Sequence, residues 1–382
     1  MTDNERDVLR QNAFTKVDMW HAAGYTGKPI EECYIWNTES VGSDHGDSVD
    51  LRIKQTFPDA PIKRAGLTLT TAGGVKATAN YKGVERDVEE FIKNEKIKVI
   101  TRSVGGGTAT DTEESHYWNA LKAKYNLIFF NAAGNDGLDG CGGSFPPDVA
   151  FYIAACTLNR YGKPVRANYS SIGPEVDFIT FVGFQNGTSF SGPSMACQAF
   201  GLVARYGRDV SEAEVFAWLK RHAMDIKAGI DYATGWGLPI FPDPKKKYIT
   251  LKVGEKAFKC DGVKYPIDVE IKNVGWSVFV PARVISEALG KKVEASHNAD
   301  GKMICTVSDA SGKLIFTEGD KFVQCVDTLG NIKKKDAYGV PYLEPVDKKF
   351  SRFMFPIRVV SEHFGCMVEW LQDEQKVMIM EA

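Results

Sequence analysis

Stretches with the periodicity of a β-strand alternate with helix-like stretches over the first 240 residues of the chain. Residues 97–101, 126–131 and 149–155 are short runs rich in β-branched, aromatic or other apolar residues. Segments 84–94 and 117–125, which precede the first two runs, carry apolar residues at helical spacing. This alternation predicts an α/β fold, with a parallel sheet covered by helices. Functional residues are then expected beyond the carboxyl ends of the strands.

A segment dense in turn-forming residues divides the sequence near residue 244. Residues 235–244 read Gly-Trp-Gly-Leu-Pro-Ile-Phe-Pro-Asp-Pro, and three lysines follow them. Glycine, proline and a cluster of like charges together predict a linker. Because 382 residues are enough for two or three domains, we expect a first domain over 1–244 and a second, smaller one over 245–382.

The second part of the chain contains an internal repeat. Residues 279–294 recur as residues 354–369, about 75 positions later, with Pro281 matching Pro356. Each copy has the pattern of a helix that begins at proline and ends at glycine, followed by a strand. Two copies are too few for a solenoid, so the pattern predicts a pseudo-symmetric α+β domain. An Arg and a Glu four residues apart in each copy are interpreted as an intrahelical ion pair.

The overall composition argues against several classes of protein. The 49 acidic and 47 basic side chains nearly balance, so no general affinity for nucleic acid or an anionic membrane is expected. No apolar run is long enough to span a bilayer, and the N-terminus shows no secretory signal. Eight scattered cysteines without a Cys-x-x-Cys pair are interpreted as mostly reduced core thiols rather than a zinc site. These features favour a cytoplasmic protein or the processed form of a secreted one.

Three polar segments carry the candidate chemistry of the first domain. Ser189 follows Gly187 and Thr188 and is expected to open an apolar helix, whose dipole favours negative charge beside a nucleophile. His45 lies at the expected start of another helix and could take a proton from a serine. Asn135 follows a buried strand, and its amide could donate to an oxyanion. Taken singly, the three residues are explained at least as well by a helix cap, a surface histidine and a turn.

Taken together, these segments resemble the subtilisin-like serine peptidases. The motifs that carry the resemblance follow the family's order: Ser-Val-Gly-Gly at 103–106, Ala-Ala-Gly-Asn at 132–135 and Asn-Gly-Thr-Ser at 186–189. The resemblance covers residues 10–240, approximately. It implies a three-layer sandwich with a mostly parallel sheet, and an endopeptidase that acts on a peptide or protein substrate through an acyl-enzyme.

The resemblance also implies a role for each site residue. Ser189 would attack the peptide carbonyl, His45 would act as base and then as acid, and Asn135 with the Ser189 backbone amide would hold the oxyanion. No cofactor is implied, and the sequence does not indicate whether a structural calcium ion is bound. The residues implied to contact an extended substrate are Ser103, Gly105, Gly106, Ala133 and Gly134.

The sequence departs from the family pattern at the third member of the triad. The family has an aspartate at the end of a strand, and the alignment puts Asn37 at that position. Asn37 can accept a hydrogen bond from an imidazole, but it supplies no negative charge to stabilise an imidazolium. Glu39 and Asp44 are nearby carboxylates that could serve instead, Glu39 in preference because Asp44 adjoins His45 directly. The alternative function is therefore a catalytically impaired pseudopeptidase that binds a peptide or protein.

The C-terminal repeat resembles the N-terminal domain of some copper amine oxidases, a stalk-type domain also found on bacterial surface proteins. The residues that carry the resemblance are Val-Pro-Ala-Arg at 280–283 and Phe-Pro-Ile-Arg at 355–358, with the Glu and Gly that follow each. No copper site is expected, because His297 and His363 lack neighbouring ligands at a useful spacing. The resemblance implies a spacer or a binding module, whose partner would be a polymer or another protein.

Overall fold

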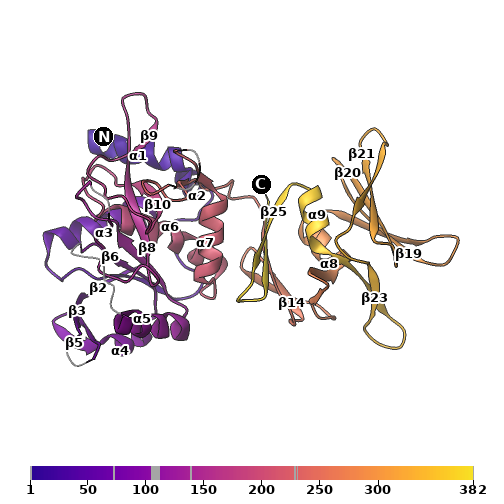
Figure 1. Cartoon of the computed structure of the whole chain (residues 1–382), viewed down its shortest axis with the longest axis horizontal. Helices are drawn as coiled ribbons and strands as arrows, with labels where there is room; N and C mark the ends of the chain where they lie inside the picture. Colours follow the sequence, from indigo (N-terminus) through magenta and orange to yellow (C-terminus); the bar gives the residue numbers. More distant parts are fainter. Residues whose placement is uncertain are drawn as a thin grey trace. The chain divides into compact units, whose positions relative to one another are not determined.

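The chain divides after Pro244 into two units, which are described separately (Figure 1). The division falls where the sequence predicts it, but the segment 235–244 is not a linker. Leu238–Pro239 (β12) pairs with Ala223–Met224 (β11), and Phe241 is fully buried, so the segment packs into the first unit. In this computed structural model the described residues are 2–71, 74–104, 112–137, 140–227, 229 and 231–381.

A parallel sheet forms the centre of the first unit, with the strand order β10-β8-β7-β6-β1-β2. Each neighbouring pair along this path is parallel, and β9 adds an antiparallel strand beside β8. The parallel α/β sheet expected from the sequence is confirmed. Its strands are Tyr34–Asn37 (β1), Ile62–Arg64 (β2), Ile97–Arg102 (β6), Ile128–Ala132 (β7), Phe151–Leu158 (β8), Pro164–Arg166 (β9) and Val176–Phe181 (β10).

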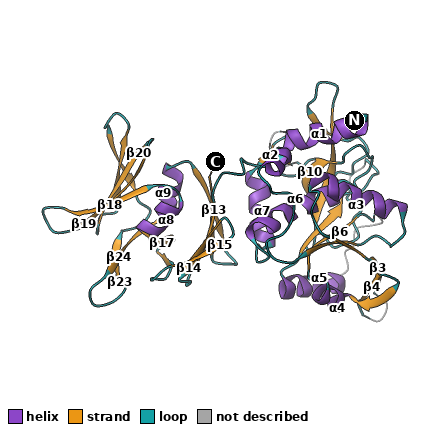
Figure 2. Cartoon of the chain, turned by 180° about the vertical axis from the view of Figure 1, so that it is seen from behind, coloured by secondary structure: helices purple, strands orange, loops and turns teal. Residues whose placement is uncertain are grey.

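Helices cover both faces of this sheet and produce three layers (Figures 1 and 2). On one face, α6 (Ser191–Tyr206) packs over five of the strands with all of its residues buried. On the other face, Trp36 and Phe129 join aromatic residues of α4 (Val88–Asn94) and α5 (Thr112–Tyr125) in one apolar cluster. The remaining elements are α1 (Asp3–Thr15), α2 (Val17–Ala22), α3 (Asp44–Thr56), α7 (Glu212–Arg221), β3 (Gly66–Thr70), β4 (Lys76–Tyr81) and β5 (Val84–Asp87).

The segment 84–94 differs from its predicted structure. Its first four residues form strand β5, and helix α4 begins only at Val88. Strand β5 pairs with β4, and β4 pairs in turn with β3, in a small antiparallel sheet. Residues 84–87, which the helical spacing of apolar residues assigned to a helix, therefore belong to this sheet. The Asp87 side chain then caps α4 by accepting from two backbone N–H groups of its first turn.

Each copy of the repeat in the second unit contains a strand followed by a short helix. In the first copy β17 (Ser277–Pro281) leads into α8 (Ala282–Ala288), and in the second β24 (Ser351–Pro356) leads into α9 (Ile357–His363). Proline is the N-cap of both helices, and a glycine with positive φ follows each of them. The predicted proline start and glycine stop are confirmed.

The two copies of the repeat are arranged about an approximate twofold axis. Strands β17 and β24 pair antiparallel with Val280 opposite Phe355, two residues that hold equivalent positions in the repeat. Helix α9 packs on β17 and α8 packs on β24, so each copy covers the strand of the other. The Arg–Glu pairs expected within the helices are present, at 3.7 Å in α8 and 3.1 Å in α9. The pseudo-symmetric pair predicted from the sequence is confirmed.

Antiparallel sheets complete the second unit, in the orders β15-β14-β13-β26-β25, β16-β17-β24-β23 and β18-β19-β20-β21-β22. All eight cysteines of the chain are free and seven are buried, in agreement with core thiols. In the described part of the chain, the helices are too short or too polar to cross a membrane. The other strands are β13 (Tyr248–Lys252), β14 (Ala257–Cys260), β15 (Val263–Pro266), β16 (Lys272–Val274), β18 (Lys292–His297), β19 (Met303–Asp309), β20 (Gly312–Thr317), β21 (Phe322–Asp327), β22 (Ile332–Asp336), β23 (Tyr342–Pro345), β25 (Cys366–Leu371) and β26 (Lys376–Glu381).

We expect residues 245–382 to fold without the first unit, because they contain their own apolar core around both copies of the repeat. The isolated fragment should unfold in one cooperative transition, measured by circular dichroism during heating. Phe355→Ala removes a fully buried ring that stacks on Phe316 and should destabilise the fragment by about 3–5 kcal/mol. Phe350→Ala, at a ring that is 61% exposed, should change stability by less than about 0.5 kcal/mol. A fragment without a cooperative transition would contradict the expectation.

Candidate active site

The candidate site lies at the carboxyl edge of the sheet, where β1 and β6 end side by side. The strand order reverses here, because β2 lies on one side of β1 and β6 lies on the other. Parallel α/β sheets leave a crevice for chemistry at such a switch point. Glu39 follows the end of β1, and Ser103 follows the end of β6. The site therefore lies at the edge of the sheet where the sequence analysis expects it.

His45 comes from the first turn of helix α3, the helix start that the sequence predicts. Ser43 caps this helix, and its hydroxyl accepts a hydrogen bond from the Gly46 backbone N–H at 3.2 Å. A Cβ atom on Gly46 would lie 2.9 Å from an Arg64 nitrogen and 3.1 Å from the Glu39 Cβ. Glycine at this position thus allows the helix to begin close to the end of β1.

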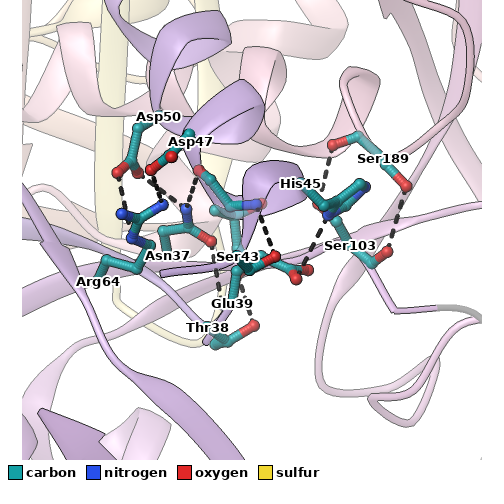
Figure 3. A network of polar contacts seen from close by, with 12 residues as sticks. Asn37, Thr38, Glu39, Ser43, His45, Asp47, Asp50, Arg64, Ser103 and Ser189 are labelled. Atoms are coloured by element: carbon teal, nitrogen blue, oxygen red, sulfur yellow. Dashed lines mark hydrogen bonds and ion pairs between the residues drawn. The ribbon is translucent and has the colours of Figure 1, made fainter. Parts of the chain in front are cut away.

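Glu39 is the carboxylate that faces His45. Its Oε2 atom lies 3.3 Å from His45 Nδ1, with 12% of the Glu39 side chain and 41% of the His45 side chain exposed. The hydrogen bond to Glu39 raises the pKa of His45 above its ordinary value, against the opposing effect of burial. A proton held on Nδ1 by Glu39 leaves the other ring nitrogen, Nε2, as the basic one. Figure 3 shows the imidazole between Glu39 and Ser189.

The described hydrogen bonds of Asn37 include the Gly46 carbonyl but not His45, so the prediction that its side chain accepts from the imidazole is wrong. Its side-chain oxygen instead accepts from the Glu39 backbone N–H at 3.1 Å, and its amide nitrogen donates to Asp50 Oδ1 at 2.8 Å. Asn37 is buried, and its hydrogen bond to the Glu39 backbone stabilises the turn after β1. The same hydrogen bond fixes the position from which the Glu39 side chain extends. We therefore interpret Asn37 as a positioning residue. Asp44, the other carboxylate considered, is exposed and has no described contact with His45.

The Asn37 amide nitrogen faces a group of charged side chains, formed by Asp47, Asp50 and Arg64 (Figure 3). Arg64 lies 3.6 Å from Asp50 through its Nε atom and 2.6 Å from Asp47 through Nη1. Burial raises the pKa of Asp50, and the hydrogen bond from Asn37 and the charge of Arg64 partly oppose that rise. An amide at position 37 therefore suits the site, because it donates to a carboxylate that already lies in a partly buried position.

Ser189 lies in a turn ahead of helix α6 rather than in the helix. The helix begins two residues later, at Ser191 with Phe190 as N-cap, so the predicted helix start is wrong by two positions. The Ser189 hydroxyl donates to the Ser103 carbonyl at 3.2 Å, and the Ser103 hydroxyl donates to the Ser189 carbonyl at 2.8 Å. The ring centroids of Phe190 and His45 are 5.8 Å apart, and Figure 3 draws Ser189 in the same part of the site as the imidazole.

Asn135 is oriented by Thr188, a residue that the sequence analysis did not single out as functional. The Thr188 backbone N–H and hydroxyl donate to Asn135 Oδ1 at 2.8 and 3.0 Å. With that oxygen occupied, the Asn135 amide nitrogen has no acceptor among the described residues, and neither has the Ser189 backbone N–H. The two donors lie 3.7 and 3.9 Å from the point where a Cβ on Gly187 would stand. Gly187, at φ +120°, therefore keeps the space between them open.

The structure changes the interpretation of the predicted substrate-contacting residues. Ala133 is fully buried, and the backbone N–H and C=O groups of Ala133 and Gly134 all bond within the protein. Their backbone groups are therefore not free to pair with a substrate strand, and they support the turn that carries Asn135; that these two residues contact substrate stays a prediction. Gly105 and Gly106 lie outside the described residues. In the described ranges, His, Cys, Asp and Glu side chains form no group of three that could hold a metal ion.

Comparisons with known proteins find similarity to a domain family and to solved proteases. Residues 243–304 match the family model described as the copper amine oxidase N-terminal domain, which agrees with the resemblance of the C-terminal repeat. A comparison with curated proteins gives no match. Similar solved structures include a lanthipeptide protease, at 17% identity over 61% of this chain and 93% of that chain with a TM-score of 0.45. Another is the psychrophilic subtilisin-like protease Apa1 from the Antarctic psychrotroph Pseudoalteromonas sp. AS-11, at 13% identity over 60% and 95% of the chains with a TM-score of 0.44.

We expect Asn37→Asp to destabilise the first unit. The new carboxylate would replace a hydrogen bond of 2.8 Å to Asp50, and two carboxylates this close oppose each other's ionisation. The free energy of unfolding should fall by about 1–3 kcal/mol at pH 8. The loss should shrink below about pH 5, because one of the two groups then takes up a proton in the folded state. Thermal denaturation of the full chain at several pH values measures both effects.

The matched control combines Asn37→Asp with Asp50→Asn. This double variant exchanges the amide and the carboxylate, so the hydrogen bond between the two positions is kept with its donor on the other side. It should recover most of the stability that Asn37→Asp loses. An Asn37→Asp protein as stable as the wild type at pH 8 would contradict the placement of Asn37 beside Asp50.

Proposed function

We propose that the first unit is a serine endopeptidase whose triad consists of Ser189, His45 and Glu39. The observation that carries the proposal is the contact between His45 Nδ1 and Glu39 Oε2, at 3.3 Å, at the switch point of the sheet and in the same part of the site as Ser189 (Figure 3). A carboxylate that orients an imidazole beside a serine is the arrangement that serine nucleophiles require. The substrate would be a peptide or protein, bound across the carboxyl edge of the sheet.

The proposed reaction begins when the Ser189 hydroxyl leaves the Ser103 carbonyl and turns its proton toward His45 Nε2. The serine oxygen attacks the peptide carbonyl carbon while the imidazole takes the proton, and Glu39 stabilises the resulting imidazolium. The Asn135 amide nitrogen and the Ser189 backbone N–H would donate to the oxyanion that forms.

The tetrahedral intermediate then collapses to an acyl-enzyme. The leaving amine receives its proton from the His45 imidazolium, and the Ser189 ester remains. Water attacks this ester with His45 again acting as base, and the second tetrahedral intermediate releases the carboxylic acid product and the free serine. A bound substrate would also shield the imidazole from water, which strengthens its interaction with Glu39.

A second candidate function is a pseudopeptidase that binds a peptide or protein without cleaving it at a useful rate. One observation favours it: the Ser189 hydroxyl donates to the Ser103 carbonyl rather than to the imidazole. If that hydrogen bond persists when a peptide is bound, the serine is not activated. The two functions share the same binding site and differ only in the chemical step.

A phosphonofluoridate probe together with a fluorogenic peptide distinguishes the two functions. We expect the probe to label Ser189, and Ser189→Ala to abolish labelling and to lower hydrolysis by roughly 10³-fold or more. Ser296→Ala, at an exposed serine of the second unit, is the matched control and should leave both unchanged. Labelling of the buried Ser191 or Ser194 would contradict the assignment of the nucleophile. A folded wild type that neither reacts nor cleaves would favour the pseudopeptidase.

A further inference from the structure

A groove of about 600 Å³ opens on the second unit, distant in sequence from the candidate active site. The turn between β16 and β17, the residues after β22, the start of α9 and strands β25 and β26 line it. Three aromatic side chains are among the lining residues, and two of them are more than one third exposed. The aromatic residues of the groove are Trp276, Tyr338 and Trp370.

Trp276 is the most unusual residue of the groove. It occupies the second position of a two-residue turn with Gly275, and φ is positive at both positions, +54° and +73°. Turns of this kind favour glycine at the second position, because a side chain there strains the backbone. The Trp276 side chain is nevertheless fully exposed, at 101%. The indole is therefore not packed against the rest of the unit and is accessible to a ligand.

Tyr338, another lining residue, also combines a positive φ with an exposed ring. Its φ is +60°, again in the left-handed region, and 44% of the residue is exposed. The Ser277 hydroxyl, next to Trp276, donates to the Tyr338 carbonyl, so the two aromatic turns are tied to each other. Two exposed aromatic residues in left-handed backbone conformations thus line one groove.

Planar polar side chains accompany the aromatic rings. Gln372 Oε1 accepts from the Trp370 indole N–H at 2.6 Å, which orients both side chains. Asp336 and Arg358 bring one negative and one positive charge, and Arg358 also pairs with Glu362 at 3.1 Å. The groove therefore offers both donors and acceptors without a large excess of either charge among its lining residues.

We propose that this groove binds an extended, uncharged glycan made of pyranose units. A pyranose ring carries C–H groups on its face, which stack on aromatic rings, and hydroxyl groups around its rim, which both donate and accept hydrogen bonds. The balanced charge of the lining fits an uncharged chain. A proline-rich peptide also docks in aromatic grooves, but it offers few N–H groups to acceptors such as Asp336. The groove therefore suits a glycan better than such a peptide.

The proposal is tested by titrating the full chain with cellohexaose and with chitohexaose in a calorimeter. We expect at least one of them to bind and to shift the tryptophan fluorescence, because the exposed Trp276 indole becomes covered. Trp276→Asn should weaken this binding by about tenfold or more without lowering the melting temperature, because asparagine tolerates a left-handed backbone. Phe350→Ala removes another exposed aromatic side chain of the same unit that does not line the groove, and it should bind like the wild type.

Three outcomes would overturn the proposal. The first is that neither oligosaccharide binds to the folded chain. The second is that Trp276→Asn binds as tightly as the wild type, or that Phe350→Ala is weakened to the same extent. The third is that a polyproline peptide, but neither oligosaccharide, binds in a way that depends on Trp276. None of these outcomes bears on the peptidase proposal, since the groove and the candidate active site share no residue.

Discussion

The contact between the His45 imidazole and the Glu39 carboxylate is the interaction on which the rest of the candidate site depends. It orients the imidazole, holds the proton on one ring nitrogen and leaves the other ring nitrogen basic. Its geometry is set by the end of β1, where the buried Asn37 side chain accepts from the Glu39 backbone N–H. The site thus uses a carboxylate two residues beyond the strand end, and an amide at the strand end that places it.

In the other half of the candidate site, too, neighbouring residues hold the side chains that are proposed to take part in the chemistry. Thr188 occupies the oxygen of the Asn135 side chain, and the amide nitrogen has no acceptor among the described residues. Gly187 leaves the space between that nitrogen and the Ser189 backbone N–H free of a side chain. Orientation of donors before substrate arrives is what makes an oxyanion site effective. The buried and hydrogen-bonded backbone of Ala133 and Gly134 supports this arrangement.

The sequence predicts the fold better than the details of the site. The parallel sheet, the boundary at 244 and the repeat follow from periodicity and turn residues, and these depend on local chemistry. Strand β5 and the packing of segment 235–244 could not be predicted from the local sequence. In both cases pairing with another strand overrides the local preference: β5 pairs with β4, and β12 within 235–244 pairs with β11. The family pattern alone could not decide whether Asn37 or Glu39 lies beside the imidazole, because that depends on which of the two side chains the turn after β1 directs at His45. The side-chain oxygen of an Asn often accepts a hydrogen bond from the backbone N–H two residues later, which here belongs to Glu39. Asn37 itself is therefore the one local signal of this arrangement in the sequence.

Nuclear magnetic resonance titration of the His45 imidazole tests the central claim most directly. A carboxylate beside an imidazole favours its protonated form, so Glu39 should hold the pKa of His45 above about 6.5 in the wild type. In Glu39→Gln that pKa should fall, and the imidazole should lose its proton at lower pH. In Asp44→Asn, where another nearby carboxylate is removed, it should stay as in the wild type. An unchanged pKa in Glu39→Gln, or a fall in Asp44→Asn instead, would contradict the account.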